Sequence, residues 1–212
     1  MIDFYTWQTP NGRKIAIMLE ECGLAYTPHA IDIGKDEQFA PTFVGISPNG
    51  KIPAIIDHDT REGPVSIFES AAILIYLAEK TGRFLAPAGA RRAKTLQWLT
   101  WQVAGVGPML GQANHFNTVA PEKIEYAINR FTTEATRLLK VMNSQLEHNP
   151  YIAGDDYSIA DIALYPWIIL ALKAMTRDDP GLAKELAATR RWTEKIGERA
   201  AVKTGMSMSV RD

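Results

Sequence analysis

Apolar and polar residues in the first part of the chain follow first the period of a strand and then the period of a helix. Ile2, Phe4 and Thr6 interleave with Asp3, Tyr5 and Trp7, which predicts a strand. After the turn signal at 9–12 (TPNG), apolar residues recur at 15, 18, 19 and 22, one face of a helix. Gly23 is predicted to end this helix, since glycine adopts the left-handed conformation at low cost.

The next residues predict a second strand, then a hairpin, and then a second helix. Residues 26–33 indicate a second strand, and apolar runs at 51–57 and 65–68 flank the turn signal at 59–64. Ser70 is predicted to cap a helix that stops at Gly82. The predicted order is therefore β-α-β followed by β-β-α, a compact α/β unit of about 80 residues.

The pattern changes to a purely helical one after a short segment, 84–90, that is typical of a linker. A helix over 91–103 is expected to be interrupted at Gly105, Gly107 and Pro108. Another is expected to open with Pro121 and to end at Pro150, with the clearest 3.6-residue period in the chain. We therefore predict three parts: an α/β domain at 1–83, a linker at 84–90 and an all-helical domain at 91–212.

Composition narrows the function classes. The net charge is −1 and no basic stripe occurs, which argues against a nucleic-acid partner. No apolar run approaches the ~20 residues that a membrane-spanning helix needs, and the first residues are unlike a signal peptide. Cys22 is the single cysteine, so no internal disulfide can form, and we expect a cytoplasmic protein.

Two motifs in the two predicted domains carry a family resemblance. The segment 46–54 (ISPNGKIPA), followed by 68–70 (FES), resembles the glutathione-binding signature of glutathione transferases. The segment 157–161 (YSIAD) is similar to that family's helix-capping motif. The resemblance implies a thioredoxin-like domain at 1–83 followed by an all-helical domain, the glutathione transferase fold.

A finer resemblance points to one class. The segments 9–14 (TPNGRK), 98–102 (WLTWQ) and 107–112 (GPMLGQ) resemble the bacterial nu class. That class implies a glutathione-dependent disulfide reductase with weak transferase activity, working as a homodimer. Its co-substrate is glutathione or glutathione disulfide, with one or two glutathione molecules per site. No metal is implied.

The resemblance assigns glutathione-binding roles to four residues around the first motif. A cis bond between Ile52 and Pro53 would present the backbone of Ile52 to the cysteinyl part of the ligand. Ser70 and the start of its helix would hold the γ-glutamyl carboxylate, and Glu69 would pair with the ammonium group. From the residues alone, Pro53 reads equally as a trans proline at a strand start, and Ser70 as an N-cap.

Lys51, Gln38 and Arg130 are also assigned to ligand binding. Lys51 and Gln38 would hold the remaining polar ends of glutathione. Arg130 lies off the apolar stripe of its helix and would reach the carboxylate of a second glutathione. On local sequence alone, each of these three side chains can equally be a solvated surface group.

Thr9 and Asn11 are the predicted catalytic pair. The chain has no Cys-x-x-Cys motif, so the reactive thiol must belong to bound glutathione. The Thr9 hydroxyl, the Asn11 amide and the first N–H groups of the helix would stabilise the thiolate. The alternative is that Thr9 only caps the helix, with Pro10 at its first position and Asn11 incidental.

Two other functions remain open at this point. The same thiolate can add to an electrophilic carbon, as in conjugating glutathione transferases. The protein can also bind glutathione or apolar ligands without turnover, as a regulator. Cys22 falls on the predicted buried face of its helix, so we interpret it as a packing residue.

Overall fold

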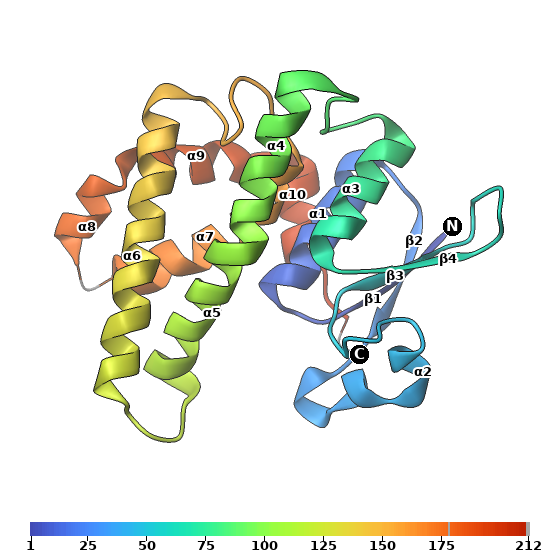
Figure 1. The fold of residues 1–212 in the computed structure, drawn as a ribbon, viewed down its shortest axis with the longest axis horizontal. Helices are drawn as coiled ribbons and strands as arrows, with labels where there is room; N and C mark the ends of the chain where they lie inside the picture. The colour runs from blue at the N-terminus through green and yellow to red at the C-terminus, as the bar shows by residue number, and fades with distance from the viewer. Residues whose placement is uncertain (178, 211–212) are drawn as a thin grey trace. The chain divides into compact units, whose positions relative to one another are not determined.

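The computed structural model describes residues 1–177 and 179–210, and their contacts divide the chain into two compact units. The first unit joins Met1–Pro87 to the C-terminal segment from Glu198 onward, and the second is Ala88–Gly197. The C-terminal segment, which the sequence places at the end of a helical region, therefore packs with the α/β part of the chain. Figure 1 shows the elements of both units.

A four-stranded mixed sheet forms the centre of the first unit, in the order β2-β1-β3-β4. Strand β1 (Ile2–Thr6) runs parallel to β2 (Tyr26–Ala30) and antiparallel to β3 (Ala54–Asp57), and β3 pairs antiparallel with β4 (Val65–Phe68). The predicted β-α-β-β-α order is confirmed. The sheet buries Ile2 and Phe4 of its inner strand.

Strands β2 and β3 are shorter than the sequence predicted. The second strand stops at Ala30 because Asp32 caps a 3₁₀ turn, with its carboxylate accepting from the Gly34 N–H at 2.9 Å. The third begins at Ala54, directly after Pro53, whose ring nitrogen has no hydrogen to donate to a strand ladder.

Helices cover the sheet. Helix α1 (Pro10–Cys22) packs against both α3 (Ser70–Thr81) and the C-terminal α10 (Ala200–Ser207), whereas the short α2 (Pro41–Val44) lies on the other side of the strands (Figure 1). The 3₁₀ turns η1 (Ile33–Lys35) and η2 (Glu37–Phe39) precede α2.

Two arginines attach α10 to the rest of the first unit. Arg199 pairs in bidentate fashion with the buried carboxylate of Glu21, with an Nη2–Oε2 distance of 2.9 Å. Arg13 donates to the backbone carbonyls of Met206 and its neighbours at the end of α10. Charge-assisted bonds of this kind are among the stronger ones in proteins, so the C-terminal helix is fastened at both of its ends.

The second unit is helical throughout. A continuous run comprises α4 (Gly89–Trp101), the π-helical turn η3 (Gln102–Val106), α5 (Gly107–Asn114) and a second π-helical turn, η4 (His115–Val119). Then follow α6 (Glu125–His148), α7 (Ile159–Met175), α8 (Pro180–Glu185) and α9 (Ala187–Gly197). Figure 1 shows α5 and α6 side by side, in agreement with their contacts.

The expected interruption near Gly105, Gly107 and Pro108 takes the form of a π-helical turn between α4 and α5, and Pro108 sits in the first turn of α5, where its missing N–H is tolerated. One sequence prediction for this unit was wrong. Pro121 does not open the long helix, which begins at Glu125. Five residues of the predicted apolar stripe are buried in α6: Ala135, Leu138, Leu139, Met142 and Leu146.

The predicted capping box at the start of α7 is present. Oδ2 of Asp161 accepts from the backbone N–H of Ser158 at 3.0 Å and from its hydroxyl at 2.9 Å. Oδ1 of Asp161 accepts from Ile152 N–H and from the indole of Trp192, both at 2.9 Å. Burial raises the pKa of Asp161, and these four donors oppose that shift.

We predict that Ser158→Ala lowers the free energy of unfolding by ~1 kcal/mol, the usual cost of losing a helix cap. Urea titration followed by circular dichroism measures the loss, and affinity for glutathione, measured calorimetrically, is expected to stay constant. A stability change below about 0.3 kcal/mol would show that the remaining donors to Asp161 satisfy it without the hydroxyl.

No helix in residues 1–177 and 179–210 combines the length and the apolar character needed to cross a membrane.

Candidate functional site

A cavity of about 210 Å³ in the first unit collects most of the predicted site residues. Its lining comprises Asn11, Asn49, Lys51, Ile52, Pro53, Glu69 and Ser70. Six of these are residues that the sequence analysis had singled out. They come from three separate places in the chain: the first turn of α1, the segment before β3, and the junction of β4 and α3.

The start of α1 forms one wall of this cavity. Thr9 is the N-cap, with extended backbone angles, and its hydroxyl oxygen accepts from the Gly12 N–H at 3.2 Å. Pro10 occupies the first helical position and Asn11, which lines the cavity, the second. Thr9 is therefore a cap, as the simpler interpretation held, and it lies beside the cavity without being part of its lining. Its hydroxyl hydrogen is still available to a further acceptor, since a hydroxyl both donates and accepts.

The segment before β3 forms the second wall. The peptide bond between Ile52 and Pro53 is cis, as predicted. Lys51 is exposed at the cavity, whereas Pro53 is buried. Ser47 fixes the segment from behind, because its hydroxyl donates to the Lys51 carbonyl at 2.8 Å.

The start of α3 forms the third wall, and here the structure corrects the sequence. Ser70 is the first residue of α3, not its cap; the N-cap position belongs to Glu69, whose side chain makes no capping bond. Glu69 has φ 69° and ψ 118°, a conformation that costs a non-glycine residue roughly 1–3 kcal/mol. Because the N-cap residue makes no side-chain capping bond, the site keeps the positive end of a helix for an anion.

Two side chains at this wall were missed by sequence reasoning. Asn49 donates to a carboxylate oxygen of Glu69 at 3.3 Å; its signal was its place inside the 46–54 motif. Lys14 lies behind Ser70, only 1% exposed, with its Nζ donating to the Ser70 hydroxyl oxygen at 3.2 Å. Burial lowers the pKa of Lys14 to about 7, and the charge of Glu69 acts in the opposite direction. The available signal was a lysine inside an otherwise apolar helical run.

The two remaining predicted binding residues are not in the cavity lining. Gln38 is buried, contrary to the surface alternative; its Nε2 donates to Asp36 at 3.4 Å, while its Oε1 has no partner in the described part of the chain. Arg130 is exposed on α6, in the second unit.

The single cysteine is not part of the cavity. Cys22, at the far end of α1, is partly buried, and its Sγ lies 3.5 Å from the Thr81 hydroxyl. Burial raises the pKa of this thiol, which keeps it protonated and poorly nucleophilic. The structure therefore supports the interpretation of Cys22 as a packing residue.

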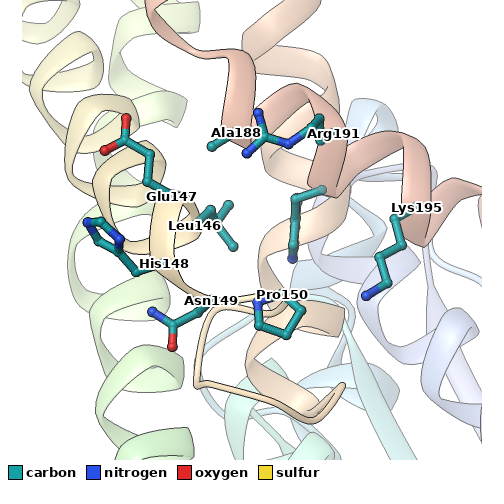
Figure 2. A pocket seen from close by; sticks show the side chains of 9 residues that line it. Leu146, Glu147, His148, Asn149, Pro150, Ala188, Arg191 and Lys195 are labelled. Atoms are coloured by element: carbon teal, nitrogen blue, oxygen red, sulfur yellow. The ribbon is translucent and has the colours of Figure 1, made fainter.

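A second, larger cavity of about 440 Å³ lies within the helical unit, between the end of α6 and α9 (Figure 2). Arg191 and Lys195 project from successive turns of α9 beside it, and Pro150 and Asn149 close its lower side in the view (Figure 2). None of the predicted site residues lines it.

Family comparisons agree with the fold. Residues 9–80 match the model of the glutathione S-transferase N-terminal domain, and residues 125–195 match that of the C-terminal domain. The chain belongs to the glutathione S-transferase family.

Particular relatives are close along nearly the whole chain. Disulfide-bond oxidoreductase YfcG of Escherichia coli K12 is 52% identical over 98% of this chain and 94% of its own length. Disulfide-bond oxidoreductase YghU of the same organism is 45% identical over 96% of this chain and 73% of its own length.

Solved structures of relatives contain glutathione. A glutathione transferase family member from Pseudomonas fluorescens Pf-5, with two glutathione bound, superposes with a TM-score of 0.92 at 40% identity, covering 98% of this chain and 93% of that one. A glutathione transferase from Pseudomonas putida, with one glutathione disulfide per subunit, gives 0.91 at 39% identity, covering 98% and 91%.

Proposed function

We propose that this protein is a glutathione-dependent disulfide-bond oxidoreductase in which bound glutathione supplies the reacting thiol. The observation that carries the proposal is that the glutathione-signature residues and Asn11 line one cavity, while the chain's single cysteine lies outside it. The 52% identity with a disulfide-bond oxidoreductase supports the choice of reaction.

The cavity suits glutathione in one orientation. The γ-glutamyl carboxylate would lie at Ser70 and the uncapped start of α3, with its ammonium group at Glu69. The backbone of Ile52 would pair with the cysteinyl part of the ligand, as an added strand does. Lys51 and Gln38 would take the remaining polar ends. This orientation directs the sulfur towards Asn11 and the start of α1.

The protein's task in the reaction is to keep that sulfur ionised. A cysteine-like thiol of pKa ~8.5 is only about 3% thiolate at pH 7. A lowering of ~2 units needs ~2.7 kcal/mol and gives about 75% thiolate. Two hydrogen bonds to the sulfur anion, from the Asn11 amide and the Thr9 hydroxyl, supply at least this amount, since bonds to charged groups contribute ~1.5–3 kcal/mol each.

The reaction consumes two glutathione molecules. The thiolate attacks one sulfur of the substrate disulfide, forming a mixed disulfide and releasing the other sulfur as a thiolate, which takes up a proton. The thiolate of a second glutathione then attacks the glutathione sulfur of the mixed disulfide. The products are glutathione disulfide and a second substrate thiol. Arg130 is proposed to bind the carboxylate of the second glutathione.

We propose a cytoplasmic location and a dimeric assembly for this protein. A cytoplasmic location would provide the pool of reduced glutathione that the reaction consumes. We also propose a homodimer, the usual symmetric assembly of soluble proteins. Size-exclusion chromatography with light scattering measures the assembly directly.

One assay tests the reaction class. Purified protein receives glutathione with either a model disulfide, such as hydroxyethyl disulfide, or an activated aryl halide. Fast disulfide reduction with slow aryl conjugation is the expected result. Faster conjugation than reduction would make the protein a conjugating transferase, and glutathione binding without either reaction would make it a binding protein.

We further predict that Cys22→Ser keeps at least half of the wild-type disulfide reductase kcat/KM. The reason is that Cys22 lies outside the cavity and its thiol is held protonated by burial. Steady-state kinetics of the folded variant measure this. A folded but inactive Cys22→Ser protein would mean that the chain supplies a working thiol of its own.

A further inference from the structure

Lys14 is a fully buried lysine that donates a hydrogen bond to a residue of the cavity wall. Its side chain is 1% exposed, and it lies on α1 among buried Ile15, Met18 and their neighbours. Nζ donates to Oγ of Ser70 at 3.2 Å. A charged group in such a place costs free energy unless a counter-charge is near, so a buried lysine beside a ligand site calls for an explanation.

Ser70 connects this lysine to the cavity. Its Oγ accepts from Lys14, so the hydroxyl hydrogen points away from the lysine, and Ser70 itself lines the cavity. A hydroxyl that accepts from an ammonium group becomes a better donor, because hydrogen bonds in a chain polarise one another. The acceptor that the chemistry of the site favours is an anion, since the uncapped positive end of α3 points to the same place.

We propose that Lys14 is a positioning residue for glutathione: from behind the cavity wall, it acts through Ser70 to hold the γ-glutamyl carboxylate, and the bound carboxylate in turn favours the ammonium form of Lys14. This inference rests on the proposed function, because it takes glutathione as the ligand. It adds the claim that ligand binding and protonation of one buried side chain are coupled.

The direction of the coupling follows from the surroundings of Lys14. In the empty protein its pKa is about 7, lowered by burial, so above pH 7 the amine is mostly neutral. A carboxylate on the far side of Ser70 favours the ammonium form and raises that pKa again. Glutathione therefore binds more tightly below pH 7 than above it, and binding above pH 7 takes up a proton.

Glu69 is the charged group whose field acts on Lys14, and it favours the ammonium form. The other charged or titratable groups on α1 and on the two helices packed against it are Arg13, Glu20, Glu21, Cys22, Tyr76, Glu79, Lys80, Arg199 and Lys203. Several of them are engaged elsewhere: Glu21 pairs with Arg199, Glu20 accepts from Tyr26, and Lys80 pairs with Asp57. The expected pH dependence therefore belongs to Lys14.

Calorimetry with S-methylglutathione tests the coupling, because this ligand has no thiol proton to lose. Titrations at pH 7.5 in phosphate and in Tris, buffers of different ionisation enthalpy, give the number of protons exchanged. We expect the wild-type protein to take up more than about half a proton per site, and its Kd to rise about tenfold between pH 6.0 and pH 8.5.

Lys14→Met keeps most of the length of the side chain and removes the titrating group. We expect this variant to bind S-methylglutathione about tenfold more weakly than wild type at pH 6.0, with the pH dependence of its Kd and its proton uptake both reduced to the contribution of the ligand's own amine. Lys203→Met, at an exposed position of α10, is the matched control and should match wild type in both measurements.

The outcomes separate the two claims. Wild-type protein that is folded but binds neither glutathione nor S-methylglutathione would overturn the proposed function itself. Wild-type protein that binds with a Kd independent of pH and with no proton uptake would overturn only the role of Lys14. A folded Lys14→Met variant with wild-type affinity and wild-type proton uptake would also overturn the role of Lys14. If that variant does not fold, the pH dependence and proton uptake of the wild-type protein still test this role.

Discussion

Replacing Gly205 with alanine is expected to destabilise the protein by about 3 kcal/mol, a large effect for one methyl group. A Cβ at this position of α10 would lie 2.6 Å from the backbone nitrogen of Ile17 and 2.7 Å from its Cα. These are backbone atoms in the middle of α1, so no side-chain rotation relieves the clash. Alanine favours a helix by about 1 kcal/mol over glycine, and this local gain is smaller than the cost of separating α1 and α10.

Thermal unfolding and hydrogen exchange of α10 measure the effect. We expect a lower Tm and faster exchange over Ala200–Ser207, since Arg13 and Arg199 would hold the helix at a longer distance. Gly111→Ala is the matched control, because a Cβ in α5 would make only an ordinary contact, 3.5 Å from Trp167. Equal stability of both variants would show that α10 is not packed as closely as described.

Asn11→Ala is expected to lower disulfide reductase kcat/KM at least tenfold, with the fold retained. Asn11 lines the cavity at the second position of α1, and the proposed sulfur position lies beside it. The loss of one hydrogen bond to a thiolate corresponds to ~1.5–3 kcal/mol, or roughly 10- to 150-fold. Because the thiol pKa would rise, the pH profile of kcat/KM should shift upward, and part of the loss should be recovered near pH 9.

Asn11→Asp distinguishes the amide donor from the shape of the side chain. It has the same size, and an acidic residue in the first turn suits the helix, so stability should not fall. A carboxylate beside the sulfur disfavours the thiolate, and we expect a larger loss of activity than in Asn11→Ala. If Asn11→Ala, Asn11→Asp and Thr9→Ala all keep wild-type activity, the sulfur lies elsewhere in the protein.

Lys14 and Glu69 illustrate why part of the site was beyond sequence reasoning. The 46–54 and 68–70 motifs indicated Lys51, Ile52, Pro53, Glu69 and Ser70, and these residues do line one cavity. Lys14 has no motif of its own, and its burial depends on α3 and α10, which lie far along the chain. The positive φ angle of Glu69 likewise depends on how β4 joins α3, and the residue type at this position does not indicate it.

The sequence by itself determined the features that depend on neighbours along the chain. These are the strands and helices that follow the period of the apolar residues, the capping box of Ser158 and Asp161, and the residues that make up the glutathione signature. Only the tertiary structure decided that the last helix packs on α1 through Gly205. The same holds for the start of α3, where Glu69 makes no side-chain capping bond, and for the burial of Lys14 behind Ser70. The physical reason is the sequence separation of the residues that interact. Helical period and caps arise from contacts within a few residues, whereas burial and pKa values depend on segments that folding brings together from across the chain.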